Sequence, residues 1–183
     1  MAVLIGVDIG TQGTKAALYS DEGRKLAEAF EASQIRRPAP GAVEEDAHRQ
    51  AASVTRTIAT CVEQVNPAEV AAVAIDGQMA GVIGVDAEGT AITPYDSWLD
   101  TRCAPQIAQM ASRAGDRIVE LAGCAPSYNH GPKILWWREH HPELFARIAA
   151  FVQPGGYAAM RLCGLSGAEA FIDTSYLHFS GFA

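Results

Sequence analysis

The sequence of 183 residues has few features of a disulfide-stabilised or zinc-binding protein. Its four cysteines are Cys61, Cys103, Cys124 and Cys163, and no two of them form a C-x-x-C pair. Small disulfide scaffolds and zinc sites both rely on closely spaced cysteines. We therefore expect four reduced thiols and no zinc site.

Positive charge and long apolar runs are also scarce. The chain has 14 Lys and Arg against 21 Asp and Glu, and its basic residues gather no further than pairs such as Arg36 and Arg37. A nucleic-acid-binding face needs a basic patch, so nucleic acid is not an expected partner. No uncharged apolar stretch reaches the roughly eighteen residues of a membrane span, and the N-terminus has no basic leader region. The sequence thus predicts a cytoplasmic protein with no membrane partner.

Apolar residues are plentiful, and their spacing predicts an α/β fold. They make up 49% of the chain, enough for one domain core. Apolar runs bounded by Gly-rich or polar turns indicate strands, whereas apolar residues at helical spacing indicate helices. The expected strands are an antiparallel meander of 3–9, 14–19 and 24–31, a strand at 70–78 buried on both faces, and a hairpin over 81–92. The expected helices are 47–65 capped by Asp46, 102–113, 115–122, 132–148 broken at Pro142, and 155–162.

Several charged and aromatic residues fit ordinary structural roles. Trp136 and Trp137 lie mid-helix at apolar spacing, which places them in the core. Glu44 and Glu45 fall in the segment ahead of the helix cap, so we expect them in solvent, with a place at the wall of a cleft as the alternative.

The segment GVDIGTQGTK, residues 6–15, combines a carboxylate with a turn of small and hydroxyl residues. A Gly-rich and Thr-rich hairpin lets backbone N–H groups and the hydroxyls of Thr11 and Thr14 approach a phosphate. Asp8 would suit Mg²⁺ held through water. The alternative is a tight hairpin in which Asp8 satisfies its own turn. The segment lacks the G-x-x-x-x-G-K-[ST] pattern and leads into a strand, which excludes a P-loop.

Five motifs follow one another along the chain. They are GVDIGTQGTKAAL at its start, VEED at 43–46, AIDGQMAG at 74–81, SWLDTR at 97–102 and GPKILWWREHHPELF at 131–145. In this order they resemble the N-terminal domain of the FGGY carbohydrate kinases, the family of xylulokinase, ribulokinase and glycerol kinase. The third is similar to the xylulokinase Gly-Gln-Met-His, and the fourth to the family's Trp-x-Asp-x-Arg. The resemblance covers nearly the whole chain.

The resemblance implies an RNase H-like fold of the actin and hexokinase type, with a mixed sheet, N-terminal antiparallel hairpins and flanking helices. It implies ATP-dependent phosphorylation of a sugar or polyol hydroxyl, with Mg²⁺ and with a pentulose or related ketose as the first candidate. Residues 1–183 would form the N-terminal sugar-binding domain, and the C-terminal nucleotide domain and the general base would lie beyond residue 183. The apolar end FIDTSYLHFSGFA fits such a fragment.

The resemblance also assigns roles to residues of this chain. Asp8 would attend the metal. The phosphate contacts would be Thr11, Gln12, Gly13 and Thr14. The sugar site would be shaped by Gln78, Met79, Ala80, Trp98, Asp100 and Arg102, because a sugar needs polar partners for its hydroxyls and an apolar or aromatic wall against its carbon face. The alternatives are that Gln78 only ends a strand and that Asp100 and Arg102 form a structural pair beneath the pocket.

Two departures from the family matter for specificity. Ala80 stands where xylulokinases carry the His of Gly-Gln-Met-His, and Leu99 replaces the Asn of their Trp-Asn-Asp-Gly-Arg. Both changes make the site more apolar, so the identity of the sugar is left open.

Three readings of the function remain at this point. The first is a sugar or polyol kinase, with a homodimer as an option. The second is another kinase or ATPase of the actin-like superfold, which would have no reason to carry both GQM and WLDTR. The third is a non-catalytic sugar-binding module.

Overall fold

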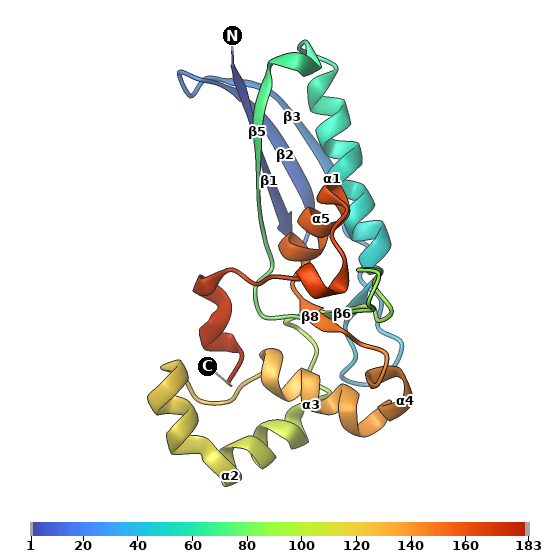
Figure 1. The fold of residues 1–183 in the computed structure, drawn as a ribbon, viewed down its shortest axis with the longest axis vertical. Coiled ribbons are helices and arrows are strands. Elements are labelled where there is room, and N and C mark those ends of the chain that lie inside the picture. The colour runs from blue at the N-terminus through green and yellow to red at the C-terminus, as the bar shows by residue number, and fades with distance from the viewer. Residues whose placement is uncertain (1, 182–183) are drawn as a thin grey trace.

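The computed structural model describes residues 2–181, and its largest element is a four-stranded mixed sheet. The strand order is β3-β2-β1-β5 (Figure 1). The first three strands form the predicted antiparallel meander, and β5 lies parallel to β1. The strands are β1 (Val3–Gly10), β2 (Gly13–Ser20), β3 (Lys25–Ala32) and β5 (Val70–Gly77).

Two helices, α1 (Ala47–Val62) and α5 (Pro154–Cys163), cover one face of this sheet (Figure 1). Alternate residues of β1 point into the layer between sheet and helices and are buried, together with Leu18 and Val54. Each such side chain contributes about 1.5–3 kcal/mol by leaving water. Helix α1 begins where predicted, because the Asp46 carboxylate accepts a hydrogen bond from the backbone N–H of Arg49.

The opposite face of the sheet and the outer edge at β5 are open within residues 2–181. Leu4, Tyr19 and Phe30 expose 37–59% of their surface there. The expectation that 70–78 is buried on both faces was wrong, since Val73 is 42% exposed and residues 71–74 are all exposed. Strand β5 is the last strand in the sheet order, so it has a neighbour on one side alone.

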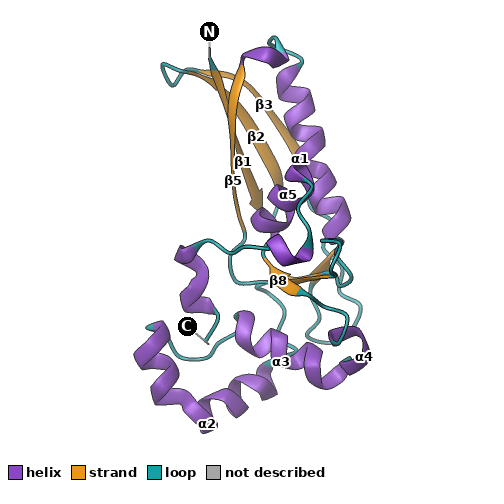
Figure 2. Ribbon diagram, viewed as in Figure 1, coloured by secondary structure: helices purple, strands orange, loops and turns teal. Residues whose placement is uncertain are grey.

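Most of the remaining elements form a second layer around two small sheets, at the end of the large sheet where β1 and β5 finish (Figure 2). One sheet pairs β4 (Glu44–Glu45) with β7 (Tyr95–Asp96), and the other pairs β6 (Ile83–Val85) with β8 (Ala150–Val152). The other helices are α2 (Ala104–Ala122), α3 (His130–His140) and α4 (Pro142–Phe145), with 3₁₀ turns η1 (Pro67–Glu69), η2 (Gly167–Glu169) and η3 (Thr174–Phe179).

The predicted helix breaks are confirmed. Helix α2 contains a non-helical residue at Ala114, between the two predicted helices, and α3 and α4 are separated at His141, just before Pro142. The hairpin over 81–92 is confirmed as a bridge between Val85 and Ala91, although β6 takes β8 as its main partner. None of the helices formed by residues 2–181 combines the length and apolar character of a membrane span.

Arg102 joins three segments of the second layer. Its guanidinium nitrogens lie 2.9 Å from a carboxylate oxygen of each of Glu44, Asp96 and Asp100. Its Cζ atom lies over the Trp136 ring, 4.4 Å from the ring centroid. The expectation that Glu44 is solvated was therefore wrong, because its side chain is 12% exposed and ion-paired. Trp137 is buried as predicted and donates its indole N–H to Asp96.

Arg102 and its three carboxylate partners form a cluster, and burial shifts the pKa values of ionisable groups in and beside it. Burial raises the pKa of Asp96 to about 7, against the opposing effect of Arg102 and Lys133. Burial also lowers the pKa of Lys133, whose ammonium group donates to the Asp100 backbone carbonyl at 2.9 Å. The cluster is thus held by Arg102 as its central cation.

Replacing Arg102 by Met is expected to lower the free energy of unfolding by about 3–5 kcal/mol, because it leaves buried carboxylates without their cation. Arg117→Met is the matched control, since Arg117 and its partner Glu120 have side chains 61% and 68% exposed and their ion pair contributes little. Urea denaturation of both variants measures the difference. Equal midpoints would show that the cluster does not hold the layer together.

Gly13 is the point of closest approach between β2 and β3. A Cβ atom there would lie 2.3 Å from the backbone oxygen of Glu31 and 2.6 Å from the Phe30 ring. Gly13→Ala is therefore expected to separate the two strands and lower Tm. Gly6→Ala is the control, because nothing lies within 4 Å of a Cβ at Gly6. Thermal unfolding checks the comparison, and a Tm of Gly13→Ala equal to that of the control would contradict the tight packing.

Candidate functional site

A pocket of about 370 Å³ opens at the carboxyl ends of β1 and β5. The two strands are parallel, so their ends meet at one edge of the sheet, the usual place for a ligand in such folds. The pocket is lined by Asp8, Gly10, Thr11, Gly77, Gln78, Met79, Ala80 and Trp98. The structure therefore brings together many of the residues that the sequence predicted for the metal, the phosphate and the sugar.

Asp8 points to the open face of the sheet. It lies in β1 between the buried residues Val7 and Ile9, and strand alternation turns its carboxylate outward, where it is exposed. An exposed carboxylate beside a Gly-rich turn, with Asp76 next to it in β5, suits Mg²⁺, which keeps most of its water and takes few protein ligands. Residues 2–181 contain no group of three or more His, Cys, Asp or Glu that could hold a metal.

Trp98 is tied to the hairpin between β1 and β2. Its indole N–H donates to the Thr11 hydroxyl at 3.0 Å, and that hydroxyl lies 3.4 Å from the Gln78 side-chain oxygen. The Trp98 side chain is nevertheless 48% exposed. The indole is thus anchored at its polar edge, with apolar surface free to contact a ligand.

Gln78 both ends the strand ladder and lines the pocket. Its backbone N–H extends the β1–β5 ladder to the Ile9 carbonyl at 3.0 Å, and its side chain lines the pocket. The side-chain amide donates to the Gly10 carbonyl at 3.4 Å and to a carboxylate oxygen of Glu45 at 3.3 Å. Its oxygen accepts a hydrogen bond from the Tyr95 hydroxyl at 3.4 Å.

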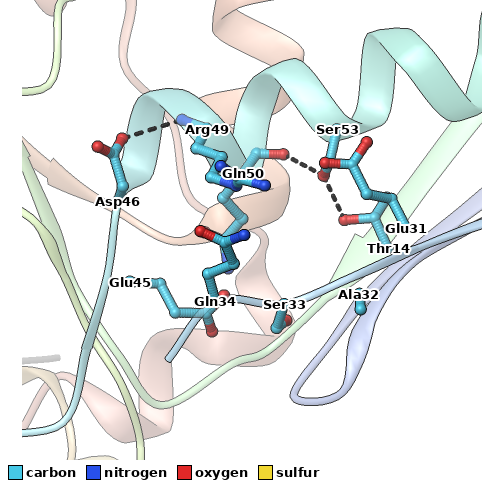
Figure 3. Close-up of a pocket in the computed structure, with 10 residues that line it drawn as sticks. All are labelled: Thr14, Glu31, Ala32, Ser33, Gln34, Glu45, Asp46, Arg49, Gln50 and Ser53. Atoms are coloured by element: carbon cyan, nitrogen blue, oxygen red, sulfur yellow. Dashed lines mark hydrogen bonds between the residues drawn. The ribbon is translucent and has the colours of Figure 1, made fainter. Parts of the chain in front are cut away.

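The other predicted phosphate contacts lie around the same turn but face different ways. Gln12 is exposed, and its carbonyl accepts a hydrogen bond from the backbone N–H of Ser33. Gly13 packs against β3. Thr14 is buried on the helix side of the sheet, with its hydroxyl 2.6 Å from that of Ser53 in α1 (Figure 3). The Thr14 side chain therefore belongs to a different pocket from Thr11.

Asp100 and Arg102 lie behind the pocket and outside its lining. The Asp100 carboxylate is buried and accepts hydrogen bonds from the Val43 backbone N–H at 2.8 Å and from Arg102 at 2.9 Å. This arrangement corresponds to the structural pair considered as the alternative. It fixes the turn of residues 97–102 that carries Trp98.

Two buried residues behind the pocket differ from the main expectation or had none, although a place for Glu45 at the wall of a cleft was the alternative. Glu45 was expected in solvent, but it is 4% exposed and reaches Gln78 from below the pocket. In the structure Val43 and Glu45 are both buried and Glu44 between them is less so, as strand alternation requires, but two successive glutamates give no such pattern in the sequence. His130 has a ring nitrogen 2.6 Å from the Met79 carbonyl, and burial lowers its pKa, which favours the neutral ring as donor.

This chain is similar in sequence and in fold to known proteins of one family. Residues 3–179 match the sequence profile of the FGGY family of carbohydrate kinases, N-terminal domain. The chain is 30% identical over 161 residues to xylulose kinase of Escherichia coli K12, covering 87% of the chain and 33% of that protein. It is 30% identical over 175 residues to xylulose kinase of Bacillus subtilis 168, covering 92% and 34%.

Several solved structures have the same fold as this chain. Xylulose kinase from Rhodospirillum rubrum superposes with a TM-score of 0.88 at 24% identity, covering 98% of this chain and 37% of that one. Plasmodium falciparum glycerol kinase with ADP gives a TM-score of 0.86 at 20% identity, covering 99% and 37%. This chain thus spans about a third of the length of these relatives. From the profile match over residues 3–179, the chain belongs to the FGGY family of carbohydrate kinases, as an N-terminal domain of that family.

Proposed function

We propose that this chain is the sugar-binding domain of a kinase that transfers a phosphoryl group from ATP to a hydroxyl of a sugar or polyol. A pentulose or related ketose is the first candidate substrate, because curated relatives at 30% identity are xylulose kinases. The observation that carries the proposal is the single pocket in which Asp8 and Thr11 lie beside Gln78 and Trp98. Groups suited to a phosphate and groups suited to a sugar meet there.

The hairpin between β1 and β2 supplies the phosphate side of the proposed site. Backbone N–H groups of the turn from Thr11 to Gly13 and the Thr11 hydroxyl bind phosphate oxygens, and Thr14 supports the turn from below. Asp8 holds Mg²⁺ through water, and the ion, when bound, neutralises charge that develops on the transferring phosphoryl group. The exposure of Asp8 beside the turn supports this assignment.

The opposite wall supplies the sugar side. The Gln78 amide lines this wall, held in place by its bonds to Gly10, Glu45, Thr11 and Tyr95. The indole face of Trp98 packs against the carbon face of the ring or chain. Met79 is 47% exposed and Ala80 lines the same wall, so both add apolar contact without a polar partner. Asp100 and Arg102 act on the sugar site indirectly, by holding the turn that carries Trp98.

The general base and most nucleotide contacts are assigned to a part of the kinase outside this chain. The relatives are about three times as long as this chain, and the family resemblance assigns the general base to a segment beyond residue 183. We infer that a second domain supplies the base and most nucleotide contacts. Phosphoryl transfer depends on holding the hydroxyl, base and Mg-ATP in line, so the 183-residue chain alone is not expected to turn over.

The full-length kinase should release ADP with at least one member of a panel of pentuloses, other ketoses, gluconate and glycerol. A coupled assay for ADP in the presence of Mg²⁺ measures this, with the 183-residue chain as the inactive control. Failure of every sugar and polyol with a folded full-length protein would count against the kinase proposal.

Asp8→Asn in the full-length kinase should lower kcat by about 100-fold or more, because a lost metal ligand removes charge stabilisation in the transition state. Tm should change little, since the side chain is exposed and makes no packing contact in the core. Asp21→Asn, in the exposed turn between β2 and β3, is the control and should leave kcat unchanged. A fall in Tm with normal kcat would favour the structural role of Asp8 in its turn.

A further inference from the structure

Helix α3 carries two buried polar side chains that reach the loops of the pocket. His130 and Lys133 expose only 2% and 1% of their surface, although each has a polar head group. They are three residues apart, so they lie on one face of the helix. The helix itself lines no part of the pocket and runs at the foot of the second layer (Figure 1). Because buried polar groups need partners, the partners of these two side chains show what the helix holds.

The partner of His130 is the main chain of the segment between β5 and β6, which we call the Met79 loop (residues 78–82). The ring atom Nε2 lies 2.6 Å from the carbonyl oxygen of Met79. A carbonyl oxygen only accepts, so Nε2 carries a proton and donates it. The ring also packs edge-on against Phe179. Met79 and Ala80 line the pocket, so His130 holds the backbone of this part of the sugar wall from behind.

The partner of Lys133 is the main chain of the Trp98 turn (residues 97–102). The Lys133 ammonium group donates to the carbonyl oxygen of Asp100 at 2.9 Å. The N–H of the same residue donates to the Ser97 carbonyl at 2.9 Å, which closes the turn around Trp98. The indole of Trp98 lines the pocket beside the Met79 loop. Lys133 therefore attaches the second part of the sugar wall to the same helix.

These two contacts do more than pack the helix against its neighbours. Packing alone could be achieved with apolar side chains of similar volume, often without loss of stability. Bonds to main-chain carbonyls instead fix where each loop lies, whatever side chains the loop presents. Since both donors belong to one rigid helix and are separated by about 4.5 Å along its axis, they also fix the two loops relative to each other.

We propose that His130 and Lys133 are positioning residues of the sugar pocket, which hold the Met79 loop and the Trp98 turn at a fixed separation from one face of α3. Neither side chain lines the pocket, so each acts through the loop that it binds. The effect on catalysis rests on the proposed function. The effect on the two loops does not depend on any activity.

The His130 bond is tested by amide hydrogen exchange of the full-length kinase without substrate. His130→Leu removes the donor at similar volume, whereas His130→Gln keeps an N–H the same number of bonds from the backbone. In His130→Leu, exchange at the hydrogen-bonded N–H groups of Gln78 and Val82 in the Met79 loop should rise about threefold to tenfold. In His130→Gln it should stay near the wild-type rate. No rise in His130→Leu, or the same rise in every segment, would overturn the proposal.

The Lys133 bond is tested in the same measurement. Lys133→Met keeps the length of the side chain without its ammonium group, so exchange should rise at the N–H groups of Asp100 and Thr101 in the Trp98 turn. Arg138→Met is the matched control, because Arg138 is an exposed cation of the same helix, and it should leave both loops unchanged. Wild-type exchange in the Trp98 turn of Lys133→Met would refute the role of Lys133. If Lys133→Met does not fold, the two His130 variants decide the proposal.

The catalytic consequence is a separation of KM from kcat. A displaced Met79 loop weakens contacts that the sugar makes in the ground state and the transition state alike, so His130→Leu should raise KM for the sugar about threefold to tenfold and leave kcat within about twofold. KM for ATP should not change, and His130→Gln should restore the sugar KM. A lower kcat with an unchanged sugar KM would show a purely structural role for His130 and overturn the proposal.

The proposed function can fail independently of this inference. A folded full-length kinase that turns over no sugar or polyol would refute the proposed function. The exchange measurements need neither substrate nor turnover, so they would still decide whether His130 and Lys133 hold the two loops.

Discussion

The parallel pairing of β1 with β5 is the constraint on which the rest of the site depends. In that register Asp8 lies beside Asp76 and Ile9 beside Gly77, so the two strands end together and Gln78 follows at the same edge as the hairpin. A shift of one residue would turn Asp8 toward the helices and bury its carboxylate. The alternation of buried Val7 and Ile9 in β1 therefore fixes both the core and the position of the carboxylate.

Charge is handled differently on the two faces of the short strand β4. Behind the cleft, Arg102 neutralises Glu44, Asp96 and Asp100, and this cluster holds the turn that carries Trp98. Beneath the cleft, Glu45 has amides and hydroxyls as its neighbours instead of a cation. Adjacent carboxylates on one short strand thus have opposite environments, the first paired with a cation and the second hydrogen-bonded to a neutral amide.

Local patterns predicted the parts of this structure that depend on nearby residues. The meander, the cap at Asp46 and the break at Pro142 follow from turn chemistry and periodicity, and three of the five motifs contain the residues that line the pocket. The burial of Glu45 and the partners of Arg102 depend on which strands pair across the chain, as β4 does with β7. The exposure of β5 was missed because an apolar run does not reveal whether a strand lies at the edge of its sheet.

The hydrogen bond between Trp98 and Thr11 has a consequence for how substrate preference can evolve in the proposed enzyme. The aromatic wall and the turn that receives phosphate share this bond, so exchanging Trp98 to admit a different sugar also disturbs the phosphate side. Met79 and Ala80 contact the same pocket through side chains with no bond to the hairpin in the described structure. Divergence toward new substrates should therefore proceed first at these two positions, where selectivity can drift without loss of turnover.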